Sequence, residues 1–278
     1  MQLNPSYGTE PVIVLDGDPA AVAAPAIRQR RRLAATLAQL TDQQWAHPSR
    51  CDGWSSRDVI VHLDSTNSFW AYTIAAGVGG ERTELLATFD PVASPADMVA
   101  ASQDKTPSEV LDQFVASTDA LVELWAGLDA ASWTALAEAP PGHISISAVT
   151  HHAIWDSWIH ERDILLPLGI SPAEEPDEVA ASLRYAAALG PAIGRNLGGD
   201  RRGSVAIQAT EPDIAFAVTI GDQVAVAPVH AAVDLQLSGG AVHLLEAFSR
   251  RVPLDQDIPD DRAWMLGGLS EIFDEIDN

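Results

Sequence analysis

The sequence predicts a two-domain protein of the α plus α/β class, in which an N-terminal four-helix bundle precedes a small α+β domain. Residues 25–170 contain four segments with apolar residues at helical spacing, separated by loops that carry proline and glycine. After residue 172 the pattern changes to short apolar runs between turn residues, which is typical of strands. A length of 278 residues suits two domains of ordinary size.

The composition indicates a folded protein that binds neither nucleic acid nor membranes. Apolar residues make up 47% of the chain and charged residues 20%, as in globular proteins. Sixteen basic against 39 acidic residues give a formal charge of −23, which repels phosphate backbones. The chain has no apolar run long enough to span a membrane and no N-terminal secretion signal. We therefore expect a cytoplasmic protein, either a monomer or a homodimer, with a small-molecule substrate.

The N-terminal segment predicts an extended lead-in with one short strand at residues 12–15. The first helix follows from Pro25, because proline suits a first helical turn, and its apolar residues recur to residue 40. A basic run in this helix is interpreted as a solvated face or, alternatively, as a contact for an anionic ligand: Arg28, Arg30, Arg31 and Arg32.

The second and third helices have clear start signals. Ser55 and Asp58 have the spacing of a capping box, in which each side chain accepts a hydrogen bond from the other residue's backbone amide. A long connection over residues 77–105, with one short helix, separates the second helix from the third. Thr106 and Glu109 form a second capping box with proline between them, and this box begins the third helix.

A break at residues 139–142, Ala-Pro-Pro-Gly, precedes the fourth helix, which is expected to end at residue 167 or 169. A further capping box is predicted from Ser171 to Glu174 and begins a helix that reaches about residue 197. The predicted divisions are a lead-in over residues 1–24, a bundle over 25–171 and an α+β domain over 172–278.

The α+β domain should contain four strands and two further helices. The strands are expected at residues 204–209, 214–220, 223–227 and 232–237, with a turn at residues 221–222. The helices are expected at residues 241–250 and 261–276.

The fourth helix places His152, Asp156 and His160 on one face, each four residues from the next. Because an unpaired buried polar group costs about 1–3 kcal/mol, these side chains need water, hydrogen bonds or a cation. Metal binding is the more specific interpretation, because Asp156 and His160 can both reach one ion. The alternative is an ordinary hydrogen-bonded pair. The third protein ligand would be His152 or, preferably, His62 on the second helix, because a bundle brings facing helices together.

The single cysteine, Cys51, excludes an intramolecular disulfide and a cysteine-based zinc site. Its neighbours Asp52 and Gly53 provide no activating cation, so a nucleophilic role is not expected.

Two motifs resemble those of a known family. Residues 45–63 read W-x-x-P-S-x-C-x-G-W-S-x-R-D-V-x-x-H-L, and residues 155–169 read WDSWIHERDILLPLG. Both resemble signatures of the mycothiol-dependent maleylpyruvate isomerase family, part of the DinB-like superfamily of metal-binding four-helix bundles. The C-terminal half is similar to the family's sterol-carrier-protein-like α+β domain.

The resemblance implies a metal triad and a thiol cofactor, mycothiol. The family's ligand positions fall on His62, Asp156 and His160, which would hold the metal and carry the catalysis, and His152 would then line the pocket or support a ligand. Zinc suits this ligand set best, with nickel, cobalt and iron as alternatives. Arg251 matches the family's arginine near a C-terminal helix and would contact the cofactor, unless it is an ordinary helix-end arginine.

The implied activity is that of a metal-dependent, mycothiol-using isomerase or S-transferase acting on a small electrophilic metabolite, in which the metal activates the thiol. The cofactor is expected between the domains. Two alternatives are a thiol-independent metal-dependent lyase, cyclase or hydrolase of a biosynthetic pathway, and a non-catalytic metal or small-molecule binding protein.

Overall fold

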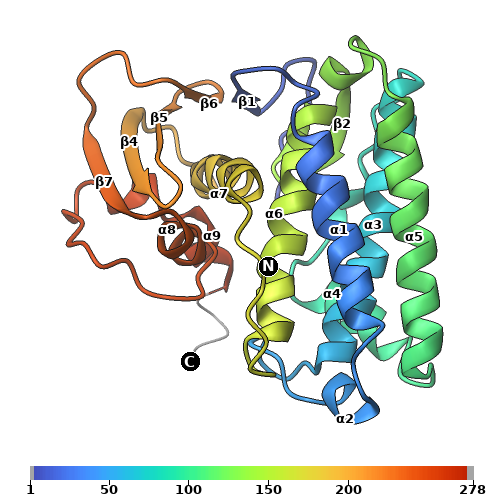
Figure 1. Cartoon of the computed structure of the whole chain (residues 1–278). Coiled ribbons are helices and arrows are strands. Elements are labelled where there is room, and N and C mark those ends of the chain that lie inside the picture. The colour runs from blue at the N-terminus through green and yellow to red at the C-terminus, as the bar shows by residue number, and fades with distance from the viewer. Residues whose placement is uncertain (1–2, 274–278) are drawn as a thin grey trace.

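The computed structural model describes residues 3–273 and confirms the two-domain architecture (Figure 1). The long helices of the N-terminal part stand side by side, and the C-terminal sheet lies to one side of them. Helix α7 (Pro176–Asn196) lies between the sheet and the bundle, where it contacts α6, β5 and β6. None of the helices within residues 3–273 is long and apolar enough to cross a membrane.

In the described part of the chain, four long helices form the bundle: α1 (Ala23–Leu37), α3 (Ser56–Val78), α5 (Pro107–Gly127) and α6 (Ile146–Leu165). Both α1 and α3 pack against α5 and α6. Short helices occupy the connections: α2 (Asp42–Trp45), η1 (Leu85–Thr88), α4 (Ala93–Ala100) and η2 (Ser132–Thr134). The four predicted bundle helices and the short helix predicted within residues 77–105 are therefore confirmed.

Local capping explains where α3 and α5 begin. The side chains of Ser55 and Thr106 accept hydrogen bonds from the amides of Asp58 and Glu109, and both acidic side chains accept from the capping residue's amide in return. Both predicted boxes are present, and the one at Ser55 fixes the first turn of α3, the helix that carries His62.

The capping box predicted from Ser171 to Glu174 is wrong. Helix α7 begins at Pro176, with Glu175 in the N-cap position. The carboxylate of Glu174 instead accepts a hydrogen bond of 2.8 Å from Arg162. Proline 176 carries the same first-turn signal as proline 172, and the ion pair with Arg162 holds the intervening chain outside the helix. The boundary expected at residues 171–172 lies in this segment and stays a prediction.

Within residues 3–273, five strands form the C-terminal sheet in the order β1-β6-β5-β4-β7. They are β1 (Ile13–Leu15), β4 (Gly203–Thr210), β5 (Ile214–Ile220), β6 (Val224–Ala227) and β7 (Leu235–Gly240). The predicted strands are present, although the last, expected at residues 232–237, spans Leu235–Gly240. The strand at the start of the chain pairs in parallel with β6, with Ile13 beside Val224. The segment expected as a lead-in therefore contributes an edge strand to the distant sheet.

Helices α8 (Ala241–Phe248) and α9 (Gly268–Phe273) and the short η3 (Ala263–Met265) complete the C-terminal domain. The helix predicted at residues 261–276 is thus divided, and its last residues lie outside the described residues. A hairpin of β2 (Leu136–Ala139) and β3 (Gly142–Ser145) directly precedes α6 and was not predicted, because its short strands flank the Pro-Pro-Gly break.

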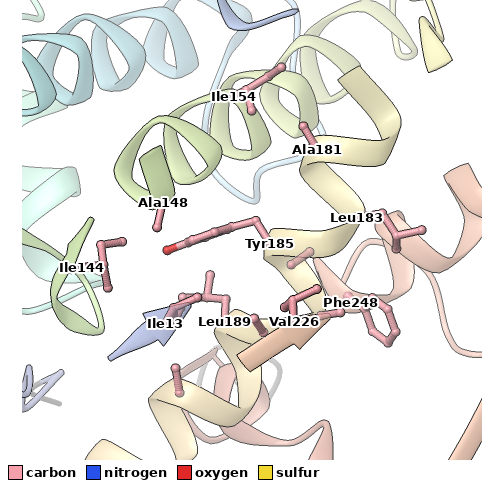
Figure 2. Packing of buried hydrophobic residues seen from close by; sticks show 14 of the residues in the cluster. Ile13, Ile144, Ala148, Ile154, Ala181, Leu183, Tyr185, Leu189, Val226 and Phe248 are labelled. Carbon is pink, nitrogen blue, oxygen red and sulfur yellow. The ribbon is translucent and has the colours of Figure 1, made fainter. Parts of the chain in front are cut away.

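The two domains share a continuous apolar core (Figure 2). Tyr185 and Leu189 of α7 lie among Ile13 of β1, Ala148 of α6 and Val226 of β6. Because α7 packs its apolar side chains against both the sheet and the bundle, the interface resembles a domain interior rather than a mobile contact.

The basic run in α1 is a solvated face only in part, because Arg28 and Arg31 are exposed but Arg30 and Arg32 are not. Arg30 is fully enclosed among the bundle helices. It donates to Asn67 at 3.1 Å and to the carbonyl oxygen of Ala153 at 2.8 Å, and it lies 5.1 Å from the ring of Trp125. Polar partners and an aromatic face thus offset part of the lost hydration, whereas Nη1 of Arg30 is buried without a hydrogen-bond partner among the described residues.

Arg32 joins α1 to both α6 and α7. It forms ion pairs of 2.9 Å with Glu161 and 2.7 Å with Glu178, two carboxylates that are almost fully buried. Arg28 also pairs with Glu178, whereas Arg31 is exposed. Helical spacing places residues 28 and 32 on the face that meets the other domain, which the sequence alone could not show.

Candidate metal centre

His62 of α3 converges with Asp156 and His160 of α6. Oδ1 of Asp156 lies 3.9 Å from Nε2 of His62 and 3.6 Å from Nε2 of His160. The two imidazole rings are 5.1 Å apart and nearly perpendicular, so their nitrogens approach the carboxylate from different directions. The structure therefore brings together the three residues preferred from the sequence.

Neighbouring side chains hold these groups in place. Oγ1 of Thr66, one turn after His62 on α3, lies 3.4 Å from Oδ2 of Asp156. The ring of Trp54 lies 5.5 Å from the ring of His62 and limits its rotation. Oδ1 of Asp156 is thus the carboxylate oxygen nearest both histidines.

The donor set fits a divalent transition metal. Two imidazole nitrogens and one carboxylate oxygen are a ligand set of catalytic zinc sites, which bind at about 2.0–2.2 Å and keep one position open. Donors around such an ion lie roughly 3.3–3.5 Å apart, and the separations of 3.6 and 3.9 Å need only small side-chain adjustments. The side chains of His62, Asp156 and His160 are 15%, 12% and 12% exposed, so none of them is fully enclosed by protein.

The electrostatics of the site favour a cation. Burial alone would raise the pKa of Asp156, but the neighbouring imidazoles of His62 and His160 hold it below its usual range. Burial alone would lower the pKa of His160, but the charge of Cys51, a hydrogen bond to Asp163 and the charge of Asp156 raise it to about 10. The surroundings thus stabilise positive charge at His160, and metal binding must displace its proton.

Asp163 fixes which nitrogen of His160 faces the other two donors. Its Oδ2 lies 2.9 Å from Nδ1 of His160. Arg251 donates to both oxygens of Asp163, at 2.9 Å to Oδ1 and 2.7 Å to Oδ2. A carboxylate at Nδ1 keeps a proton there, so Nε2 can offer its lone pair to a metal. Arg251 follows α8, and the C-terminal domain therefore helps to orient this histidine.

Cys51 also belongs to this network, and the expectation that no cation lies near it is wrong. Its Sγ lies 3.3 Å from Oδ2 of Asp163, 3.7 Å from Nδ1 of His160 and 3.8 Å from Nη2 of Arg251. The cation comes from a distant part of the chain rather than from adjacent residues. Cys51, His160 and Asp163 are close enough to form a second group of donors, but the guanidinium of Arg251 beside them disfavours a metal there.

His152 does not join the cluster. Its Nδ1 lies 2.7 Å from the hydroxyl of Tyr185 on α7, and its ring makes tilted and edge-on contacts with Trp70 and Trp155. Of the two alternatives for the third donor, the geometry favours His62. No sequence signal linked His152 to Tyr185, because their contact depends on how α6 and α7 pack.

Two shallow surface hollows lie elsewhere. One of about 380 Å³ adjoins Arg32 and Ile170, and the other, of about 300 Å³, lies beside Tyr7 and Gln223. Neither is lined by histidine or cysteine, and the guanidinium of Arg32 is already paired with carboxylates. We therefore place the candidate chemistry at the His62 cluster and not at the hollows.

Together, the fold and the site define a four-helix bundle with a candidate metal centre, joined to an α/β domain that supports one of its histidines. Residues 27–165 match the family model described as the mycothiol maleylpyruvate isomerase N-terminal domain. Because this match covers half of the chain, the protein belongs to that family.

Two solved structures share the fold. One is a mycothiol-dependent maleylpyruvate isomerase, with 15% identity and a TM-score of 0.59. The other is a histidine-to-alanine mutant of mycothiol-dependent maleylpyruvate isomerase, with 14% identity and a TM-score of 0.60. Each similarity covers 86% of this chain and 94% of the other. No curated protein sequence matches the chain.

Proposed function

We propose that this protein is a metal-dependent, mycothiol-using isomerase or S-transferase that acts on a small electrophilic metabolite. The observation that carries the proposal is the convergence of His62, Asp156 and His160 in a chain of this family. Mycothiol is the thiol in the family's description and in the names of both structural relatives. That shared description supports mycothiol as the cofactor of this chain as well.

The metal would be held by Nε2 of His62, Nε2 of His160 and a carboxylate oxygen of Asp156. When bound, a divalent metal lowers the pKa of a thiol and supplies a thiolate near neutral pH. The single carboxylate among the three groups preserves the positive charge that this task requires. Asp163 holds the ring of His160, Thr66 contacts Asp156, and Trp54 packs on His62.

Isomerisation and transfer share their first step, attack of the thiol sulfur on an electron-poor carbon. In an isomerisation the attacked double bond becomes single and rotates, and the carbon–sulfur bond then breaks to restore the double bond. In a transfer the carbon–sulfur bond persists. Both reactions need access to the metal-binding groups, and the partial exposure of all three side chains supports such access.

Cobalt substitution tests the thiol step directly. Cobalt-loaded protein should develop a sulfur-to-cobalt charge-transfer band on addition of mycothiol, and metal-free protein should bind mycothiol only weakly. S-methyl mycothiol is the control, because it keeps the sugar groups but cannot form a thiolate. Turnover of a substrate without thiol and without this band would overturn the proposal in favour of a thiol-independent metal enzyme.

A turnover assay with maleylpyruvate and mycothiol then distinguishes the two proposed activities. An isomerase should convert maleylpyruvate without net consumption of mycothiol, whereas a transferase should yield an adduct that mass spectrometry detects. Native mass spectrometry of the purified protein identifies the metal. If ligands bind but no electrophile is turned over, the protein is a binding protein instead.

A further inference from the structure

His152 and Tyr185 form a hydrogen-bonded pair beside the candidate metal centre, and none of the roles assigned above uses them. Nδ1 of His152 lies 2.7 Å from the Tyr185 hydroxyl. His152 belongs to α6 and lies one turn before Asp156, whereas Tyr185 belongs to α7. The charges of Asp156 and His62 both act on His152, which places it within electrostatic reach of the centre.

Aromatic rings from three helices surround the imidazole of His152. The ring of His152 lies 4.8 Å from Trp70 of α3, 5.2 Å from Trp155 of α6 and 5.1 Å from Tyr185. Trp155 is itself fixed by a hydrogen bond of 2.8 Å to Ser249. Figure 2 shows the Tyr185 ring reaching from α7 toward α6 near Ala148, one turn before His152. The imidazole is therefore held in one orientation.

Burial sets the direction of the hydrogen bond. Tyr185 is fully buried, and burial raises its pKa well above the ordinary value, so the hydroxyl keeps its proton. Within residues 3–273 its only hydrogen-bond partner is Nδ1 of His152. Pointing the proton elsewhere would leave a buried donor without a hydrogen bond, which is unfavourable. Tyr185 therefore donates and Nδ1 accepts.

The proton of His152 must then lie on Nε2. Burial lowers the pKa of His152 to about 4, so the ring is neutral and carries one proton. Nε2 has no hydrogen-bond partner among the described residues. It is not among the fully enclosed polar atoms that lack a partner, and it therefore keeps some contact with solvent. The site thus presents an oriented N–H donor that no group within residues 3–273 satisfies.

We propose that Nε2–H of His152, oriented by Tyr185, donates a hydrogen bond to the oxygen on which negative charge develops when the thiol adds to the electrophile. His152 is then a catalytic residue and Tyr185 a positioning residue. This inference rests on the proposed function. As the carbon–sulfur bond forms, the electron pair of the attacked carbon–carbon double bond moves onto the conjugated carbonyl oxygen. Elimination returns that pair and breaks the carbon–sulfur bond.

The contribution of such a donor has a known scale. Removal of one donor to a developing oxyanion typically lowers the rate by about 100- to 1000-fold. A neutral imidazole serves well here, because it donates without first needing to be protonated. The i, i+4 position of His152 relative to Asp156 places the donor on the helix face that carries the metal-binding groups.

The tautomer can be tested without turnover. In zinc-loaded protein labelled with ¹⁵N-histidine, Nδ1 of His152 should give the chemical shift of an acceptor nitrogen and Nε2 that of a protonated one. Tyr185→Phe keeps the ring and removes the hydroxyl, and it should abolish this preference. A protonated Nδ1 in the wild-type protein overturns the inference.

Oxalate, a planar dianion that resembles an enolate, tests the function of the donor. It should shift the Nε2 resonance of His152, and His152→Phe should weaken oxalate binding about 10-fold or more, as expected for one hydrogen bond to a charged oxygen. His151→Phe is the matched control, because His151 contacts the Ser147 carbonyl oxygen instead. Unchanged oxalate affinity in His152→Phe at equal zinc content would refute the role.

Zinc content and the cobalt band with mycothiol are measured on the same variants. If the wild type binds no zinc or shows no band, the proposed function fails whatever tautomer His152 adopts. If both are normal and only the His152 measurements disagree, the further inference alone fails. Thermal unfolding of Tyr185→Phe identifies any general loss of structure.

Discussion

Arg251 donates two hydrogen bonds to the carboxylate of Asp163, so a side chain of the C-terminal domain binds directly to a residue of the bundle. Asp163 in turn accepts from Nδ1 of His160. The orientation of a candidate metal ligand therefore depends on contacts between domains. Glu246 strengthens the same junction, because it accepts hydrogen bonds from Arg50 and Arg162, both at 2.8 Å.

Arg251→Lys should lower zinc affinity about 10- to 100-fold, the usual cost of losing support for a ligand. Lysine keeps the charge but cannot form two parallel hydrogen bonds to Asp163. Competition with a chromophoric chelator measures the change, and Arg202→Lys, at an exposed position, serves as control. Normal zinc affinity combined with weaker mycothiol binding would instead favour the cofactor contact that the family resemblance implies for Arg251.

His160→Ala should lose most of its bound metal, whereas His152→Ala should keep it. The first substitution removes a proposed direct bond to the metal, and the second removes only a neighbour of the site. Elemental analysis of both purified variants after identical zinc loading provides the comparison. Equal loss in the two variants would make His152 a ligand and would exclude either His62 or Asp156.

Arg32→Met should destabilise the protein by about 3–5 kcal/mol, because it leaves the buried carboxylates of Glu161 and Glu178 without this partner. Urea denaturation measures the free energy of unfolding. Arg31→Met makes the same change of charge at an exposed position of the same helix, and its effect should stay within about 0.5 kcal/mol. Similar effects of both substitutions would show that the interdomain ion pairs contribute little.

Glu246 should make the stability dependent on acid pH. Burial would raise its pKa, but hydrogen bonds from Arg162 and Arg50 lower it below the ordinary value. A carboxyl with a depressed folded-state pKa stabilises the fold above its unfolded pKa of about 4.3, and this contribution disappears as the pH falls through the folded-state pKa. Glu246→Gln should therefore cost about 2 kcal/mol at pH 7.

The difference between wild type and Glu246→Gln should shrink below about pH 4, where the wild-type carboxyl becomes protonated. Denaturation curves over a series of pH values measure it. Glu123→Gln, at an exposed position of α5, should differ from wild type by less than about 0.5 kcal/mol at pH 7. A constant difference for Glu246→Gln at all pH values would argue against a depressed pKa.

The features that the sequence predicted well are those with local causes. The boxes at Ser55 and Thr106 act within one turn, and the i, i+4 spacing of Asp156 and His160 follows from helix geometry alone. The family motif and the predicted bundle together indicated that His62 lies opposite these two residues. The structure brings the three side chains together. Their role as metal ligands stays a prediction.

The features that the sequence did not reveal depend on contacts between distant segments. Arg30 is buried and Arg32 is paired because of how α1 packs, which a basic run cannot show. Cys51 has a cationic neighbour only because the fold brings Arg251 of the other domain next to it. The start of α7 was misplaced because prolines 172 and 176 give the same local signal, and a contact with Arg162 decides between them.

The parallel pairing of β1 with β6 has a consequence for biosynthesis. Ile13 leaves the ribosome before every helix of the bundle, yet its register partner Val224 is translated only after all of them. The pairing of β1 with β6 therefore forms late, and β1 must remain unpaired while the bundle helices assemble beside it. Expression vectors that shorten the N-terminus should impair the C-terminal domain, although that domain lies at the opposite end of the gene.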